Sequence, residues 1–154
     1  MTTPRSVPGP GGNQLPELEP LQGLWRGIVT GLVLVMPAAI LNNLLIDDGT
    51  IEPGNPVTYL FWLLILLGGA AAGWATIRLA PSAQLAHAAA AGAGAYLVAQ
   101  GIGVVLRLLS GESISWLAFP FMALMMATCG TLGGMFARKW LQQNGPTPRS
   151  DDRP

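Results

Sequence analysis

The chain has 154 residues, of which 51% are hydrophobic and only 10% are charged, whereas an ordinary soluble domain has about 25% charged residues. Its 8 basic and 8 acidic residues cancel, which argues against the basic field of a nucleic-acid-binding protein. The single cysteine, Cys129, excludes an intramolecular disulfide framework and a thiolate metal cluster.

The first 20 residues, MTTPRSVPGPGGNQLPELEP, are rich in proline and glycine and predict a disordered tail over 1–20. The apolar run that follows predicts a membrane-spanning helix over 24–46. A signal peptide is the alternative, but the run exceeds the about 7 to 15 apolar residues of a signal core, and no small-residue cleavage site follows it. The run contains Pro37, which lacks a backbone N–H donor and predicts a kink in this helix.

Three more apolar runs follow, over 57–79, 84–109 and 115–140, separated by short segments rich in turn-forming residues. Each run is long enough to cross the bilayer core, which needs about 20 residues. The polar, proline-containing end of the chain predicts a second disordered tail over 142–154. The sequence therefore predicts an all-α integral membrane protein whose four-helix transmembrane domain covers 21–141.

The basic residues predict the orientation of the chain. Of the 8 basic residues, only Arg107, near the end of the third helix, falls toward the side opposite to the termini. Basic residues accumulate in cytoplasmic segments, so both termini are expected on the cytoplasmic side of the cell membrane. The high ratio of arginine to lysine suits a GC-rich bacterial genome. The remaining basic residues lie in the tails, at helix ends or between the second and third helices: Arg5, Arg26, Arg78, Arg138, Lys139, Arg149 and Arg153.

A weak internal similarity suggests a duplication. Shifting the second helix by 60 residues places Gly73 on Gly133. Shifting the first helix by 61 residues places Gly31 on Gly92. Apolar segments of low complexity often match by chance, so both chance and a repeat of two parallel hairpins remain open.

Small residues recur at every fourth position on one face of each helix. Three helices contain a G-x-x-x-G pair, and the third has alanines followed by a glycine. Such faces let helix backbones approach closely in lipid, which provides no hydrophobic drive for association. We expect them to pack the four helices together; a dedicated dimerisation face is the alternative. The predicted packing glycines are Gly27, Gly31, Gly69, Gly73, Gly103, Gly130 and Gly134.

Polar side chains form a second face on the third helix, where Tyr96, Gln100 and Arg107 lie within about 80° of one another. Asn42 on the first helix is expected at a similar depth. An unpaired amide is unfavourable in hydrocarbon, so Asn42 is expected to hydrogen-bond to Gln100 or Tyr96 across a packed interface. These four residues are called the polar seam below. A functional site at the same place is the alternative interpretation.

No catalytic set, cofactor site or metal-ligand cluster can be assembled from the sequence, so an enzyme is not expected. The predicted function is an accessory or scaffold membrane protein that assembles through its glycine-rich helix faces. Its expected partners are the lipid bilayer and a second copy or a larger membrane protein, and no nucleic acid. A small oligomeric transporter or channel is the alternative, with the polar strip in the outer half of the bundle. The absence of a carboxylate within the predicted spans favours the scaffold.

Overall fold

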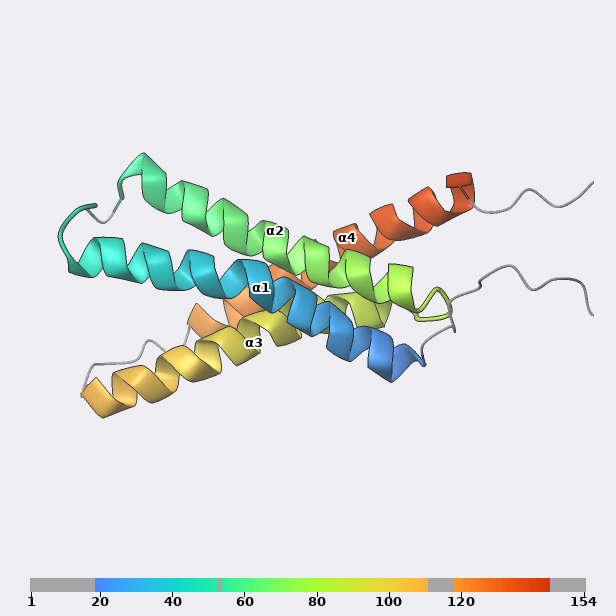
Figure 1. Cartoon of the computed structure of the whole chain (residues 1–154), viewed down its shortest axis with the longest axis horizontal. Coiled ribbons are helices and arrows are strands. Elements are labelled where there is room, and N and C mark those ends of the chain that lie inside the picture. The colour runs from blue at the N-terminus through green and yellow to red at the C-terminus, as the bar shows by residue number, and fades with distance from the viewer. Residues whose placement is uncertain (1–18, 53, 111–117, 145–154) are drawn as a thin grey trace, which may run out of the picture.

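The computed structural model describes residues 19–52, 54–110 and 118–144, and these form four α-helices. The helices run back and forth along the long axis of the molecule, so that the first begins at the end where the fourth finishes (Figure 1). All four are long and apolar enough to cross a membrane, which confirms the predicted all-helical class. The helices are α1 (Pro20–Asp47), α2 (Pro56–Leu79), α3 (Leu85–Ser110) and α4 (Ala118–Asn144).

The outer helices extend beyond the predicted spans. α1 begins at Pro20, because proline fits the first helical position, where no N–H donor is needed. α4 continues to Asn144, whose side-chain amide donates to the Trp140 carbonyl oxygen at 2.9 Å. Residues 1–18 and 145–154 of the predicted tails, and the first three residues of the predicted fourth span, lie outside the described residues.

α2 is the central helix of the bundle. In the described part of the chain it contacts each of the other three helices, as α3 also does, whereas α1 and α4 do not contact each other. Half of its apolar stretch is buried, compared with 17% in α1 and in α4. The reason lies in its sequence, since WLLILLGGAAAGWATI has no polar face to turn outward.

The backbones of α2 and α4 approach each other closely where the two helices cross. A Cβ atom added at Gly73 would collide with the carbonyl oxygen of Gly130, and one added at Gly133 would collide with that of Ala70. The two contacts are equivalent when α2 is shifted by 60 residues onto α4, and the two helices cross while running in the same direction (Figure 1). The equivalence does not extend to the other two helices. In a two-hairpin repeat α1 would correspond to α3 and α2 to α4, but in the described chain α3 contacts α2 whereas α1 makes no contact with α4.

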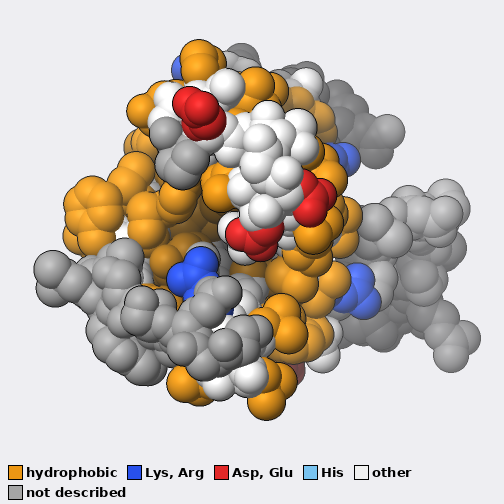
Figure 2. Space-filling view, turned by 90° about the vertical axis from the view of Figure 1, so that its left-hand side faces the viewer, with side chains coloured by type: hydrophobic (Ala, Val, Ile, Leu, Met, Phe, Trp, Pro, Cys, Tyr) orange, Lys and Arg blue, Asp and Glu red, His pale blue; other side chains and the backbone are white. Residues whose placement is uncertain are grey.

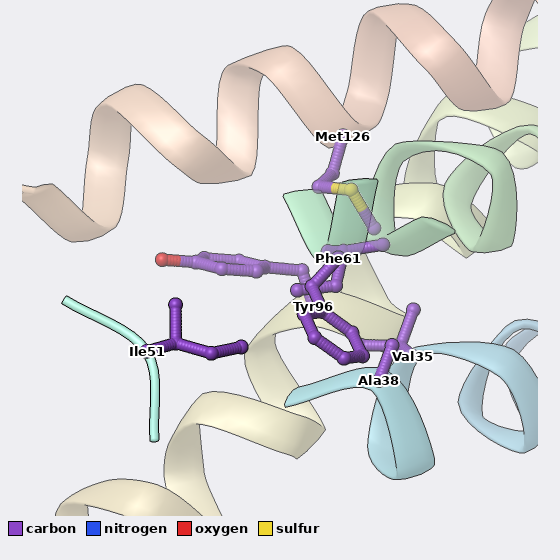
Figure 3. Close-up of a cluster of buried hydrophobic side chains, with 7 residues drawn as sticks. Val35, Ala38, Ile51, Phe61, Tyr96 and Met126 are labelled. Carbon is purple, nitrogen blue, oxygen red and sulfur yellow. The ribbon is translucent and has the colours of Figure 1, made fainter. Parts of the chain in front are cut away.

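The largest apolar cluster joins all four helices (Figure 3). Ile51, from the connection between α1 and α2, also enters it, and its backbone N–H donates to the Leu45 carbonyl oxygen at 3.0 Å. The connection therefore folds back over one end of the bundle. The buried members of the cluster are Val35, Ala38, Ile51, Phe61, Ile65, Tyr96 and Met126.

Candidate functional site

Charged side chains lie at both ends of the bundle. The loop end is defined here as the end that contains the α1–α2 connection, with Asp47, Asp48, Glu52 and, near the end of α3, Arg107. The terminal end is the opposite one, where α1 begins and α4 finishes. Figure 2 views the loop end, where acidic and basic side chains surround a hollow with apolar walls. The polar seam was predicted toward this end.

Tyr96 is the buried member of the polar seam, with 4% of its surface exposed. Its ring packs in the main apolar cluster between residues of the other helices. In Figure 3 its hydroxyl points away from Val35 and Met126, past Ile51. The side chain therefore combines an apolar body within the core with a polar tip directed toward the loop end.

Asn42 lies one turn beyond Ala38 on α1 and is partly buried. Its carbonyl oxygen, Oδ1, is buried and has no hydrogen-bond partner. Gln100, on α3, turns its Oε1 atom toward Gly103 of its own helix, 3.9 Å from where a Cβ of Gly103 would lie. α1 and α3 are in contact, but no hydrogen bond joins Asn42 Oδ1 to either Tyr96 or Gln100. Arg107 is exposed near the end of α3 and has an interaction partner of its own.

The glycines of α1 face α2. A Cβ at Gly27 would collide with the Thr76 hydroxyl, and one at Gly31 would lie 2.8 Å from Ala72 Cβ. Pro37 lies within α1, which continues as one helix to Asp47 and changes direction along its length in Figure 1.

The glycines of α2 and α4 also lie at contacts inside the bundle. Gly69 and Gly73 face α4, where an added Cβ at Gly69 would lie 2.9 Å from Met126 Cε. Gly130 and Gly134 face α3, and a Cβ at Gly134 would lie 2.6 Å from Ala88 Cβ.

Gly103 differs from the other predicted packing glycines. An added Cβ there would meet only the Oε1 atom of Gln100, and one at Gly101 would meet nothing within 4 Å. Gly101 lies in a shallow apolar depression of about 350 Å³ on α3, lined by Val98, Gly101, Ile102, Val105 and Leu106. The outer part of α3 is thus not packed against the rest of the described bundle at these positions.

The sequence interpretation missed an arrangement of arginine and tryptophan at the terminal end. The Arg78 guanidinium carbon lies 4.7 Å from the ring centre of Trp74 and 5.2 Å from that of Trp140. The nearby Arg138 donates from its guanidinium to the Ala83 carbonyl oxygen at 2.9 Å, which ties α4 to the α2–α3 connection. The spacing of Trp74 and Arg78 was a usable signal, because residues four apart meet on a helix surface. The contact with Trp140 depends on how α2 and α4 pack.

Within the described residues, no group of three His, Cys, Asp or Glu side chains could hold a metal ion. No protein-family model, curated protein or solved structure matches the chain. Fold and site together define a protein with four helices that are able to span a membrane.

Proposed function

We propose that this chain is a small multi-pass membrane protein that acts as an accessory or scaffold protein. The observation that carries the proposal is the closed centre of the bundle, where Gly73 meets Gly130 and Gly133 meets Ala70. Backbones this close leave no room for a solute path between α2 and α4. In this proposal the polar strip stays at one end of the protein and does not continue past this crossing.

The outward surface supports a membrane location. Large apolar side chains cover it, with Leu109 81%, Leu21 70% and Phe136 70% exposed. A soluble monomer rarely exposes apolar patches larger than a few hundred Å². Hydrocarbon is the solvent in which such a surface is stable, because lipid tails are as apolar as these side chains.

The glycine contacts indicate that a partner would bind at a surface other than the glycine-rich helix faces. Gly27, Gly31, Gly73 and Gly130 are occupied by packing inside the bundle. Assembly with a second copy or a larger membrane protein therefore uses the remaining apolar surface. The glycines serve assembly indirectly in this proposal, because they hold that surface in one shape.

The test is to measure self-association and flux on the same purified protein. The full chain is solubilised in detergent, its molar mass is determined by light scattering, and it is reconstituted into liposomes loaded with potassium chloride. We expect a discrete oligomer and ion efflux no faster than from empty liposomes. A strictly monomeric chain, or efflux that rises with the amount of protein, would contradict the scaffold proposal.

A transporter or channel is the second candidate, and one observation favours it. The Asn42 Oδ1 atom is buried without a hydrogen-bond partner. Such an atom lowers the stability of the fold, so its presence within a membrane-spanning helix favours a functional role. In this case Asn42→Leu would abolish protein-dependent efflux, while Asn43→Leu, at an exposed position, would preserve it. Equal efflux from both variants would exclude a transport role for Asn42.

A further inference from the structure

The arginine and tryptophan arrangement at the terminal end has the features of a binding site. We call Trp74, Arg78 and Trp140 the Arg78 clamp. Trp74 and Arg78 lie one turn apart on α2, and Trp140 comes from the last turns of α4. The guanidinium carbon lies within 5.2 Å of both ring centres, which is inside the range of a cation–π interaction. Two helices therefore position one cation.

The charge of the Arg78 clamp is not balanced by nearby acids in the described chain. Arg26, Arg138 and Lys139 lie toward the same end. The described aspartates and Glu52 all lie at the loop end, and Glu19, before α1, is the one described carboxylate at the terminal end. This end therefore attracts anions.

Arg78 is exposed although it is held by aromatic rings. A guanidinium that stacks on an aromatic ring keeps the N–H donors at its edge for other partners. Arg138, in contrast, already uses a donor on the Ala83 carbonyl oxygen. Exposed Lys139 precedes Trp140 in α4 and adds another cation toward the terminal end.

We propose that the Arg78 clamp binds the phosphate of an anionic phospholipid headgroup. Arginine recognises phosphate through paired hydrogen bonds, and tryptophan favours the headgroup level of a bilayer. Basic pockets between membrane helices bind anionic headgroups. The inference rests on the membrane location proposed above. Recovery of the chain in the membrane fraction tests that location separately.

The test uses the full chain in a neutral detergent, with bound lipids counted by native mass spectrometry during titration with phosphatidylglycerol or phosphatidylcholine. We expect phosphatidylglycerol to bind preferentially, and inorganic phosphate at millimolar concentration not to displace it. Equal retention of the two lipids would overturn the proposal. Displacement by inorganic phosphate would overturn the assignment to a lipid, because the clamp would then bind the free anion.

Two substitutions that each remove one positive charge distinguish specific binding at the Arg78 clamp from a general attraction of anionic lipid to the terminal end. Arg78→Gln should weaken phosphatidylglycerol binding about tenfold, the size of a charge-assisted hydrogen bond. Arg26→Gln, on α1, should change it less than about twofold, because Arg26 is exposed and takes no part in the two cation–π contacts that position Arg78. Equal losses in the two variants would contradict a clamp.

Trp140→Leu provides a second test that leaves every charge in place. It removes one stacking partner of Arg78, so we expect weaker phosphatidylglycerol binding with unchanged thermal unfolding. It also remains informative if Arg78→Gln does not fold. Binding of wild-type strength in a folded Trp140→Leu protein would show that the indole does not position the guanidinium.

Discussion

At the residue scale, Asn42 is where sequence and structure give different expectations. The sequence predicts a hydrogen bond between Asn42 and Gln100 or Tyr96, on the ground that amides avoid hydrocarbon unless paired. In the structure the Oδ1 atom of Asn42 is buried without a partner, and Gln100 turns its Oε1 atom toward Gly103. Periodicity predicts which helix face a residue occupies. It does not fix the side-chain rotamers on which a hydrogen bond depends.

The stability of Asn42→Leu distinguishes these two expectations by its sign. A leucine removes an unsatisfied polar atom, whose burial costs about 1–3 kcal/mol, so the structure predicts an unchanged or higher melting temperature. The predicted interhelical hydrogen bond would instead give a loss of about 0.6–2 kcal/mol. Thermal unfolding in detergent measures the difference, with Asn43→Leu as the exposed control. A clear decrease confined to Asn42→Leu would mean that its amide is paired.

At the element scale, apolar run length predicted the four helices, because a run of this length has few alternatives to a helix in lipid. The sequence also located the small-residue faces, but it did not assign each face to a partner helix. Gly92, on α3, lies one turn before Tyr96 of the polar seam. In the structure a Cβ there would collide with the Met126 carbonyl oxygen. Ile51 comes from a short connecting segment rich in turn-forming residues, yet it is buried in the main cluster.

The α2–α4 crossing predicts that one methyl group at Gly73 destabilises the bundle. Gly73→Ala places a Cβ against the Gly130 backbone, which has no side chain that can move away. The helices must separate, at a cost of about 1–3 kcal/mol, as in overpacked cores. We therefore expect a melting temperature in detergent several degrees below that of the unmodified chain.

Gly101→Ala is the matched control for this substitution. It changes glycine to alanine in the interior of a helix, but the new methyl group meets nothing within 4 Å. Alanine favours a helix over glycine by up to about 1 kcal/mol, so the melting temperature should stay the same or rise. If both variants lost the same stability, the effect would come from the helix backbone, and the close crossing would have no special role.

At the scale of the whole molecule, the two ends differ in charge. Arg26, Arg78, Arg138 and Lys139 lie toward the terminal end in the described chain, whereas the loop end has Asp47, Asp48, Glu52 and Arg107. Four helices in alternating directions place the first and last helix ends on the same side of a membrane that they span. The charge difference then predicts which side this is, since basic residues favour the cytoplasm.

Cysteine labelling in intact cells tests the orientation. Cys129 is first replaced by alanine, and one new cysteine is then introduced as Thr50→Cys at the loop end or Ser82→Cys in the α2–α3 connection. Both positions are exposed, and Thr50 is preferred to Gly49, whose φ of +69° would strain any other residue. A membrane-impermeant maleimide should label Thr50→Cys directly, and Ser82→Cys only after the membrane is permeabilised. The reverse pattern would place the terminal end outside and contradict the charge argument. Labelling of both sites in intact cells would show that the chain does not separate them across the membrane.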